Sequence, residues 1–294
     1  MKPAPFEYHV PDSLEEALFL LRDHGSDAKL LAGGQSLVPA MNFRVVQPSV
    51  IIDLNRLKEL DYVREDGGSV HIGAMTRERT LEFFPLIAEK FPLLAEAMPH
   101  VAHPQIRNRG TLGGSLANAD PAAELPVIML ALGARLKVRN ADGERWVDVQ
   151  NFFSGMFTTD LAADEMLLEI ELPSSPKRTG WSFLEVAPRA GDYALMGVAV
   201  LLTLDEDKVC KQARLVYLNA GDGPVEAKQA AQALEGEHIT DEQIASVAIL
   251  VSETEVNPFG NVHASVEYQR HLANVLTKRA LKLALQRAGE VDQQ

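Results

Sequence analysis

The amino-acid sequence predicts an α+β fold in which two small α/β subdomains precede a domain of antiparallel strands and helices. Up to about residue 176, short apolar runs alternate with amphipathic helical patterns. Beyond it, three long strand patterns follow one another and helical patterns fill the rest. The polar stretch at 174–180, which contains a proline and a glycine, separates the two parts. We therefore expect domains at 1–176 and 177–290, the first with subdomains at about 1–55 and 56–176.

In the first subdomain we expect one helix and two short strands. Ser13, followed three residues later by Glu16, is typical of a helix N-terminus, and Gly25 is typical of its end. Apolar runs predict strands at 28–31 and 50–53.

The second subdomain is expected to be richer in elements. The patterns predict strands at 60–64, 70–75, 135–139, 145–149 and 166–172, and helices beginning at Thr76 and covering 86–98 and 121–132. In the last domain they predict strands at 181–187, 194–204 and 209–219, helices at 225–234, 241–253 and 265–288, and a loop at 255–262.

Composition limits the classes of function. A length of 294 residues and a hydrophobic content of 46% suit a soluble protein with a sizeable core. The formal net charge of −13 argues against nucleic acid as a partner. No apolar run approaches the roughly 20 residues that span a bilayer, and no signal peptide is evident, so we expect a cytoplasmic protein. The only cysteine, Cys210, excludes an internal disulfide and a cysteine-ligated iron–sulfur cluster built from this chain alone.

Two glycine pairs are the candidate functional features. One lies in Ala32-Gly33-Gly34-Gln35-Ser36-Leu37 and the other in Thr111-Leu112-Gly113-Gly114-Ser115. Paired glycines let backbone N–H groups converge on an anion, and the hydroxyls can add donors, so each stretch suits a phosphate. For the second, the alternative is a tight turn before a helix, with Asp120 as N-cap and Pro121 at the first helical position.

The separation of the two pairs points to one ligand. Loops about 80 residues apart could close on the two phosphates of a single dinucleotide. Neither stretch is a G-x-G-x-x-G fingerprint or a P-loop, so a nucleotide here would not be held in the Rossmann manner.

These two stretches, in this order, resemble those of the FAD-binding medium subunit of the molybdenum hydroxylases, the family of carbon monoxide dehydrogenase and xanthine dehydrogenase. The resemblance extends over essentially the whole chain. Further matches are Gln105-Ile106-Arg107-Asn108-Arg109-Gly110, Arg189-Ala190-Gly191-Asp192-Tyr193-Ala194, Asn219-Ala220-Gly221-Asp222-Gly223-Pro224 and Ser265-Val266-Glu267-Tyr268-Gln269-Arg270.

The resemblance implies a fold and a function. The fold would be an FAD-binding domain of the p-cresol methylhydroxylase (PCMH) or vanillyl-alcohol oxidase (VAO) type, followed by a sheet-and-helix domain. The chain would be an electron-transfer subunit that carries FAD, takes electrons from [2Fe–2S] clusters of a small subunit and passes them to an external acceptor. Molybdopterin would lie on a large subunit, in a dimer of heterotrimers. The substrate and the acceptor (NAD, quinone, cytochrome or oxygen) stay open.

The resemblance also assigns cofactor-binding residues. The amides of Gly33, Gly34, Gln35 and Ser36, framed by Ala32 and Leu37, would face the FAD pyrophosphate. Thr111, Gly113, Gly114 and Ser115, with Leu112, would hold it from the other side. Asp120 and Glu124 would reach ribityl or ribose hydroxyls, Leu167 and Leu168 would contact the isoalloxazine, and Tyr193 would stack near it. The ordinary alternatives are helix capping for the two carboxylates, strand core for the leucines and a sheet aromatic for Tyr193.

Other chemistry has weaker support. His100 and His103 lack a third metal ligand in the sequence pattern, and electron transfer requires no acid–base residue, so we expect neither a metal site nor a catalytic residue on this chain. Two rival functions stay open: a self-sufficient FAD-dependent oxidase or dehydrogenase of the same fold, and an assembly subunit that binds nucleotide only structurally.

Overall fold

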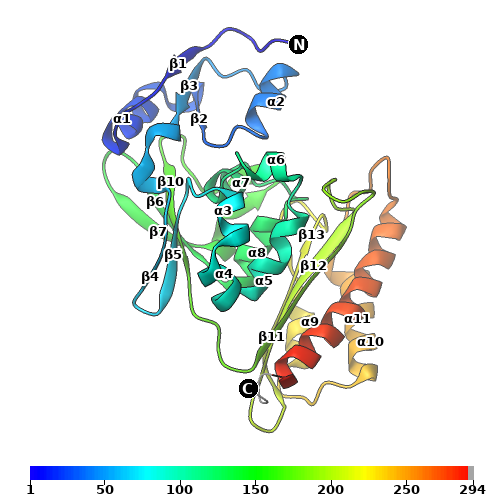
Figure 1. The fold of residues 1–294 in the computed structure, drawn as a ribbon. Helices are drawn as coiled ribbons and strands as arrows, with labels where there is room; N and C mark the ends of the chain where they lie inside the picture. The colour runs from blue at the N-terminus through cyan, green and yellow to red at the C-terminus, as the bar shows by residue number, and fades with distance from the viewer. Residues whose placement is uncertain (291–294) are drawn as a thin grey trace.

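The N-terminal subdomain is a three-stranded parallel sheet with one packed helix. The computed structural model describes residues 1–290, and Figure 1 shows this subdomain at one end of the molecule. Its strands, in the order β1-β3-β2, are Glu7–His9, Val50–Asp53 and Ala28–Leu31. Helix α1 (Leu14–His24) begins where Ser13 Oγ accepts a hydrogen bond from Glu16 N and ends at Gly25, as the sequence predicts. The short helix α2 (Leu37–Asn42) follows the first glycine pair.

The second subdomain combines a five-stranded antiparallel sheet with a layer of helices. In sheet order the strands are β4 (Val63–Asp66), β5 (Ser69–Gly73), β10 (Met166–Leu172), β6 (Arg135–Arg139) and β7 (Glu144–Asp148). The helices are α3 (Glu78–Phe83), α4 (Pro85–Lys90), α5 (Pro92–Ala97), α6 (Pro104–Arg107), α7 (Leu112–Asn118) and α8 (Glu124–Leu132), and a small hairpin is formed by β8 (Phe153–Gly155) and β9 (Thr158–Thr159).

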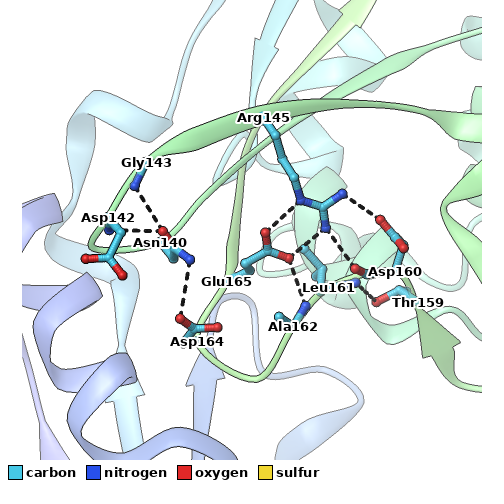
Figure 2. A network of polar contacts seen from close by, with 10 residues as sticks. All are labelled: Asn140, Asp142, Gly143, Arg145, Thr159, Asp160, Leu161, Ala162, Asp164 and Glu165. Carbon is cyan, nitrogen blue, oxygen red and sulfur yellow. Dashed lines mark hydrogen bonds and ion pairs between the residues drawn. The ribbon is translucent and has the colours of Figure 1, made fainter.

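The edge of this sheet is fixed by ion pairs. Arg145 on β7 donates hydrogen bonds to Glu165 at 2.7 Å and to Asp160 at 2.6 Å, and Asn140 reaches Asp164 (Figure 2). These carboxylates raise the pKa of Arg145, so its charge persists at any working pH. The contacts tie the β6–β7 hairpin to the turn that leads into β10, and so help to fix the position of β10.

The C-terminal domain is a four-stranded antiparallel sheet covered by helices. Its strands are β11 (Thr179–Val186), β12 (Met196–Leu204), β13 (Cys210–Leu218) and β14 (Val225–Glu226). The helices are α9 (Lys228–Leu234), α10 (Asp241–Leu250) with its π-helical extension η6 (Val251–Glu255), and α11 (Val266–Glu290). Cys210 is buried in this core, and burial raises the pKa of its thiol to about 11, so it acts as an unreactive packing residue.

One hydrophobic cluster spans the boundary between the two domains. Helices α5 and α8 lie between the five-stranded sheet and the C-terminal sheet, whose other face α11 covers (Figure 1). Phe183, Ala199 and Val216 of the C-terminal sheet belong to the same buried cluster as α8. An apolar interface of this kind holds the domains in a fixed arrangement. No helix within residues 1–290 is long and apolar enough to cross a membrane.

Three predicted helices are wrong in part. The helix expected at 121–132 begins only at Glu124, after Ala123 as N-cap. The helix expected at 86–98 is broken at Phe91, because Pro92 cannot continue it. The segment expected as a helix at 225–234 first forms β14, which pairs with β13, before α9 begins.

Candidate functional site

The first glycine pair lies directly against the backbone that leads to the second. A Cβ added to Gly33 would lie 2.3 Å from Arg109 O and 2.8 Å from the Cα of Gly110. Gly34 has φ +75°, a conformation that side chains disfavour. Gly33 therefore permits the two stretches to meet, at the junction of the first and second subdomains, and Gly34 permits the turn of the first loop.

The first glycine loop presents unused hydrogen-bond donors. Within residues 1–290, no hydrogen-bond partner is found for the backbone N–H groups of Gly33, Gly34, Gln35 and Ser36. The Gln35 amide donates to Gly33 O at 3.0 Å, and the Ser36 hydroxyl is exposed without capping α2. Consecutive unpaired amides of this kind form a concavity that suits an anion. Ala32 and Leu37 frame this group of donors.

The second glycine pair is built differently, since it lies inside the first turn of α7. Thr111 is its buried N-cap and accepts from Gly114 N at 3.1 Å. The other amides are also used: Leu112 N donates to Thr76 O, Gly113 N to Ala74 O at 2.9 Å, and Ser115 N to Thr111 O. A Cβ on Gly113 would lie 2.5 Å from that of Ala74, so this glycine permits close packing of α7 on the end of β5.

The amides of the second pair are therefore not free to bind a ligand. Gly114 faces the first loop, since its missing Cβ would lie 3.5 Å from the Cβ of Ala32. Ser115 is partly exposed, and within the described residues its hydroxyl has no hydrogen-bond partner. The second stretch contributes a close backbone approach and one hydroxyl, whereas the first contributes amides.

A polar network connects the two glycine stretches. The sequence patterns do not reveal it. Arg77 donates to Arg109 O with one nitrogen and to Asn55 Oδ1 at 2.6 Å with another. Asn55 donates in turn to Ala32 O at 3.0 Å and to Asp53 Oδ1. The only sequence signal for Asn55 and Arg77 is their position just after strands β3 and β5, on adjoining subdomains.

Two predicted carboxylates, Asp120 and Glu124, lie beyond the end of α7. Asp120 Oδ1 accepts from Ala122 N at 2.9 Å and forms a turn, so the alternative role of Asp120 as a helix N-cap is wrong. Glu124 opens α8 with 7% of its surface exposed, and burial raises the pKa of its carboxyl to about 7. At neutral pH the Glu124 carboxyl is therefore partly protonated, so it can donate or accept a hydrogen bond.

A third carboxyl, Glu78, was not predicted. It opens α3, and its carboxylate lies where a Cβ of Gly110 would be, directly behind the second stretch. Its Oε2 is buried without a hydrogen-bond partner. Burial, and then the charge of Glu124, raises the pKa of Glu78 to about 8, so the group is mostly protonated at pH 7.

The predicted apolar contacts come from two separate elements. Leu167 and Leu168 on β10 are both buried, but Leu167 belongs to the core of the second subdomain and Leu168 to that of the first. Tyr193 lies on an exposed loop whose Gly191 packs against His103, just before the second stretch. The Tyr193 side chain is 68% exposed, and partial burial, followed by the charges of Asp120 and Glu124, raises the pKa of its hydroxyl.

His100 makes an ion pair with Glu185 at 3.1 Å, between η4 (Met98–His100) and β11. Within residues 1–290, no group of three or more His, Cys, Asp or Glu side chains is arranged to hold a metal ion.

Known protein families and relatives match this chain over nearly its full length. Residues 4–175 match the family described as the FAD binding domain in molybdopterin dehydrogenase, and 181–284 match the CO dehydrogenase flavoprotein C-terminal domain. Subunit alpha of the 6-hydroxypseudooxynicotine dehydrogenase complex of Paenarthrobacter nicotinovorans is 41% identical, with 98% of this chain and 97% of the relative covered. The carbon monoxide dehydrogenase medium chain of Hydrogenophaga pseudoflava is 38% identical, over 98% and 100%.

Solved structures also match this chain over nearly its full length. A chain of carbon monoxide dehydrogenase from Hydrogenophaga pseudoflava superposes with a TM-score of 0.94, at 38% identity over 98% of this chain and 99% of that one. A chain of quinoline 2-oxidoreductase from Pseudomonas putida 86 gives 0.92, at 37% identity over 98% and 99%.

Proposed function

This chain belongs to the FAD-binding medium subunits of the molybdenum hydroxylases, and we propose that the junction of its two glycine stretches holds the diphosphate of FAD. The observation that carries the proposal is the row of unpaired amides from Gly33 to Ser36, set against the second stretch. Bound FAD supplies one- and two-electron chemistry, so the chain serves as the electron-transfer subunit between its partners and an outside acceptor.

The residues present fit such a cofactor. The amides of the first loop bind the diphosphate, while Gly114 and the Ser115 hydroxyl approach it from α7. Thr111 and Leu112 hold that helix turn in place.

The carboxyls and apolar side chains complete the proposed site. Asp120 and Glu124 meet the sugar hydroxyls, and the pKa of Glu124 near 7 allows it to accept or donate a hydrogen bond there. Leu167, Leu168 and Tyr193 provide the apolar contacts for the ring system. No acid–base step is assigned to any of them, because transfer of electrons alone needs none.

Partner subunits supply the remaining redox groups. The relatives are named as subunits or medium chains of two dehydrogenases and a hydroxylase. Cys210 is the only cysteine of this chain, so iron–sulfur clusters must lie elsewhere. We place [2Fe–2S] clusters on a small subunit and molybdopterin on a large one, in a dimer of heterotrimers in the cytoplasm. This subunit role takes precedence over a self-sufficient oxidase or a structural nucleotide-binding subunit, because the likeness to named medium chains covers the whole length.

An absorption spectrum of the purified full-length chain tests the proposal. We expect the bands of oxidised flavin and release of FAD, identified by chromatography, after denaturation. A chain that is colourless and takes up no added FAD would overturn the proposal.

A further inference from the structure

Two arginines meet at the junction of the glycine stretches without a carboxylate partner. In the part of the chain that the structure describes, neither Arg77 nor Arg109 forms an ion pair, although most neighbouring arginines do. Arg107 and Arg79, for example, both bind Glu82, at 2.9 and 3.0 Å. Arg77 instead donates only to neutral oxygens, Arg109 O and Asn55 Oδ1.

The charges at this junction are unfavourable without an anion. Loss of hydration, and then the positive charge of Arg109, lowers the pKa of Arg77. Asp53, Asp61 and Glu78 attract Arg77 only from beyond ion-pair distance. Asp53 is already occupied by Tyr8 and Asn55. A partly buried guanidinium without an ion-pair partner, beside a second arginine that is exposed, is typical of a site for an anionic ligand.

The same arginine is one link in a chain of hydrogen bonds between the two stretches. It runs from Ala32 O, through the Asn55 amide and the Arg77 guanidinium, to Arg109 O. Ala32 opens the first glycine loop, and Arg109 lies two positions before the second stretch. The chain crosses from the first subdomain to the second, so it fixes the distance between them at this point.

We propose that Arg77 and Asn55 form a clamp that sets the spacing of the two glycine stretches, and that Arg77 also supplies positive charge to the diphosphate held there. The inference rests on the proposed function, because it takes FAD as the ligand of the junction. Arg77 and Asn55 are thus positioning residues, and their two roles are separable: Asn55 contributes geometry alone, whereas Arg77 contributes geometry and charge.

The test is titration of the apo form of the full-length chain with FAD at low and high KCl. The variants are Arg77→Gln, Asn55→Ala and the double variant, and Arg79→Gln is the control. Arg79 lies two residues along the chain from Arg77, binds Glu82 and stacks on Phe83, away from the glycine stretches.

We expect each clamp variant to weaken FAD binding about 10- to 100-fold, since each breaks a charge-assisted hydrogen bond. The double variant should be little worse than Arg77→Gln, because the two residues act as one unit. Added KCl should weaken FAD binding to the wild type and to Asn55→Ala alike, but less to Arg77→Gln. Arg79→Gln should match the wild type.

Different results would overturn this inference alone and the proposed function. Wild-type affinity in both clamp variants, or an unchanged KCl dependence in a folded Arg77→Gln, would overturn the inference alone. If Arg77→Gln does not fold, unchanged affinity in Asn55→Ala has the same force. A wild-type chain that binds no FAD would overturn the proposed function, and this inference with it.

Discussion

The two glycine pairs are nearly identical in sequence and opposite in construction. Gly33 and Gly34 lie in an irregular loop whose amides have no hydrogen-bond partner within residues 1–290, and Gly34 has a positive φ. Gly113 and Gly114 lie in a helical turn whose amides are all engaged. A pair of glycines followed by a serine therefore leaves backbone donors free in one place and permits close packing of backbone in the other. Substitutions in each stretch separate these two roles.

The largest effect is expected at Gly33. Gly33→Ala would place a Cβ 2.3 Å from Arg109 O and force the two stretches apart. We expect FAD affinity, measured by flavin fluorescence, to fall by about 100-fold or more, because the unpaired amides lose their position. Gly143→Ala is the matched control, since no atom lies within 4 Å of its Cβ in the β6–β7 turn (Figure 2). Equal FAD affinity in the two variants would contradict the role of the first loop.

Gly113→Ala should instead act on stability. Its Cβ would lie 2.5 Å from the Cβ of Ala74 and 2.6 Å from Ala74 O, inside the contact between α7 and β5. Overpacking of this kind costs about 1–3 kcal/mol of unfolding free energy, which urea denaturation measures. A variant as stable as the wild type would show that α7 can move away from β5 at no cost.

The buried carboxyl of Glu78, behind the second stretch, makes the stability of the protein depend on pH. In the unfolded chain this carboxyl ionises near its ordinary pKa of 4.5, but in the folded protein it ionises only at about 8. Between these values the unfolded state releases the proton that the folded state keeps, so stability falls as pH rises from about 4.5 to about 8. Glu78→Gln should remove this contribution and stabilise the protein at pH 8, by on the order of 1–3 kcal/mol. Parallel stability–pH curves for the two proteins would refute the assignment.

The smallest effect is expected at Thr111, which caps α7. Thr111→Ala should lower the unfolding free energy by about 1 kcal/mol, because Gly114 N loses its acceptor, and Thr111→Ser should restore most of it. Thermal denaturation measures both variants. A loss in Thr111→Ala that serine does not recover would point to packing rather than capping.

The sequence predicted correctly those helices and strands whose limits are set by residues close together in the chain. The helix between Ser13 and Gly25 and the strand Met166–Leu172 were predicted correctly, because their caps and apolar runs act within a few residues. The start of α8 was missed, because Asp120 binds Ala122 N in a turn instead of capping a helix. The glycine pairs could be found, but not the difference between them, which depends on long-range bonds from Leu112 N to Thr76 O and from Gly113 N to Ala74 O.

The supporting residues of the site depend on long-range contacts. Asn55 and Arg77 are 22 positions apart and meet only when the two subdomains pack together. The burial of Glu78 behind Gly110 likewise follows from tertiary structure, since nothing in the residues around it marks a buried carboxyl. Such residues have no pattern in a single sequence that could reveal them.

The central claim is that the junction of the two glycine stretches binds a diphosphate. The most direct test compares FAD with FMN and riboflavin, which carry the same ring system without the diphosphate, in titrations of the apo form of the full-length chain. The account predicts that FAD binds far more tightly than either, and that Gly33→Ala removes most of this preference. FMN or riboflavin binding as tightly as FAD would contradict it.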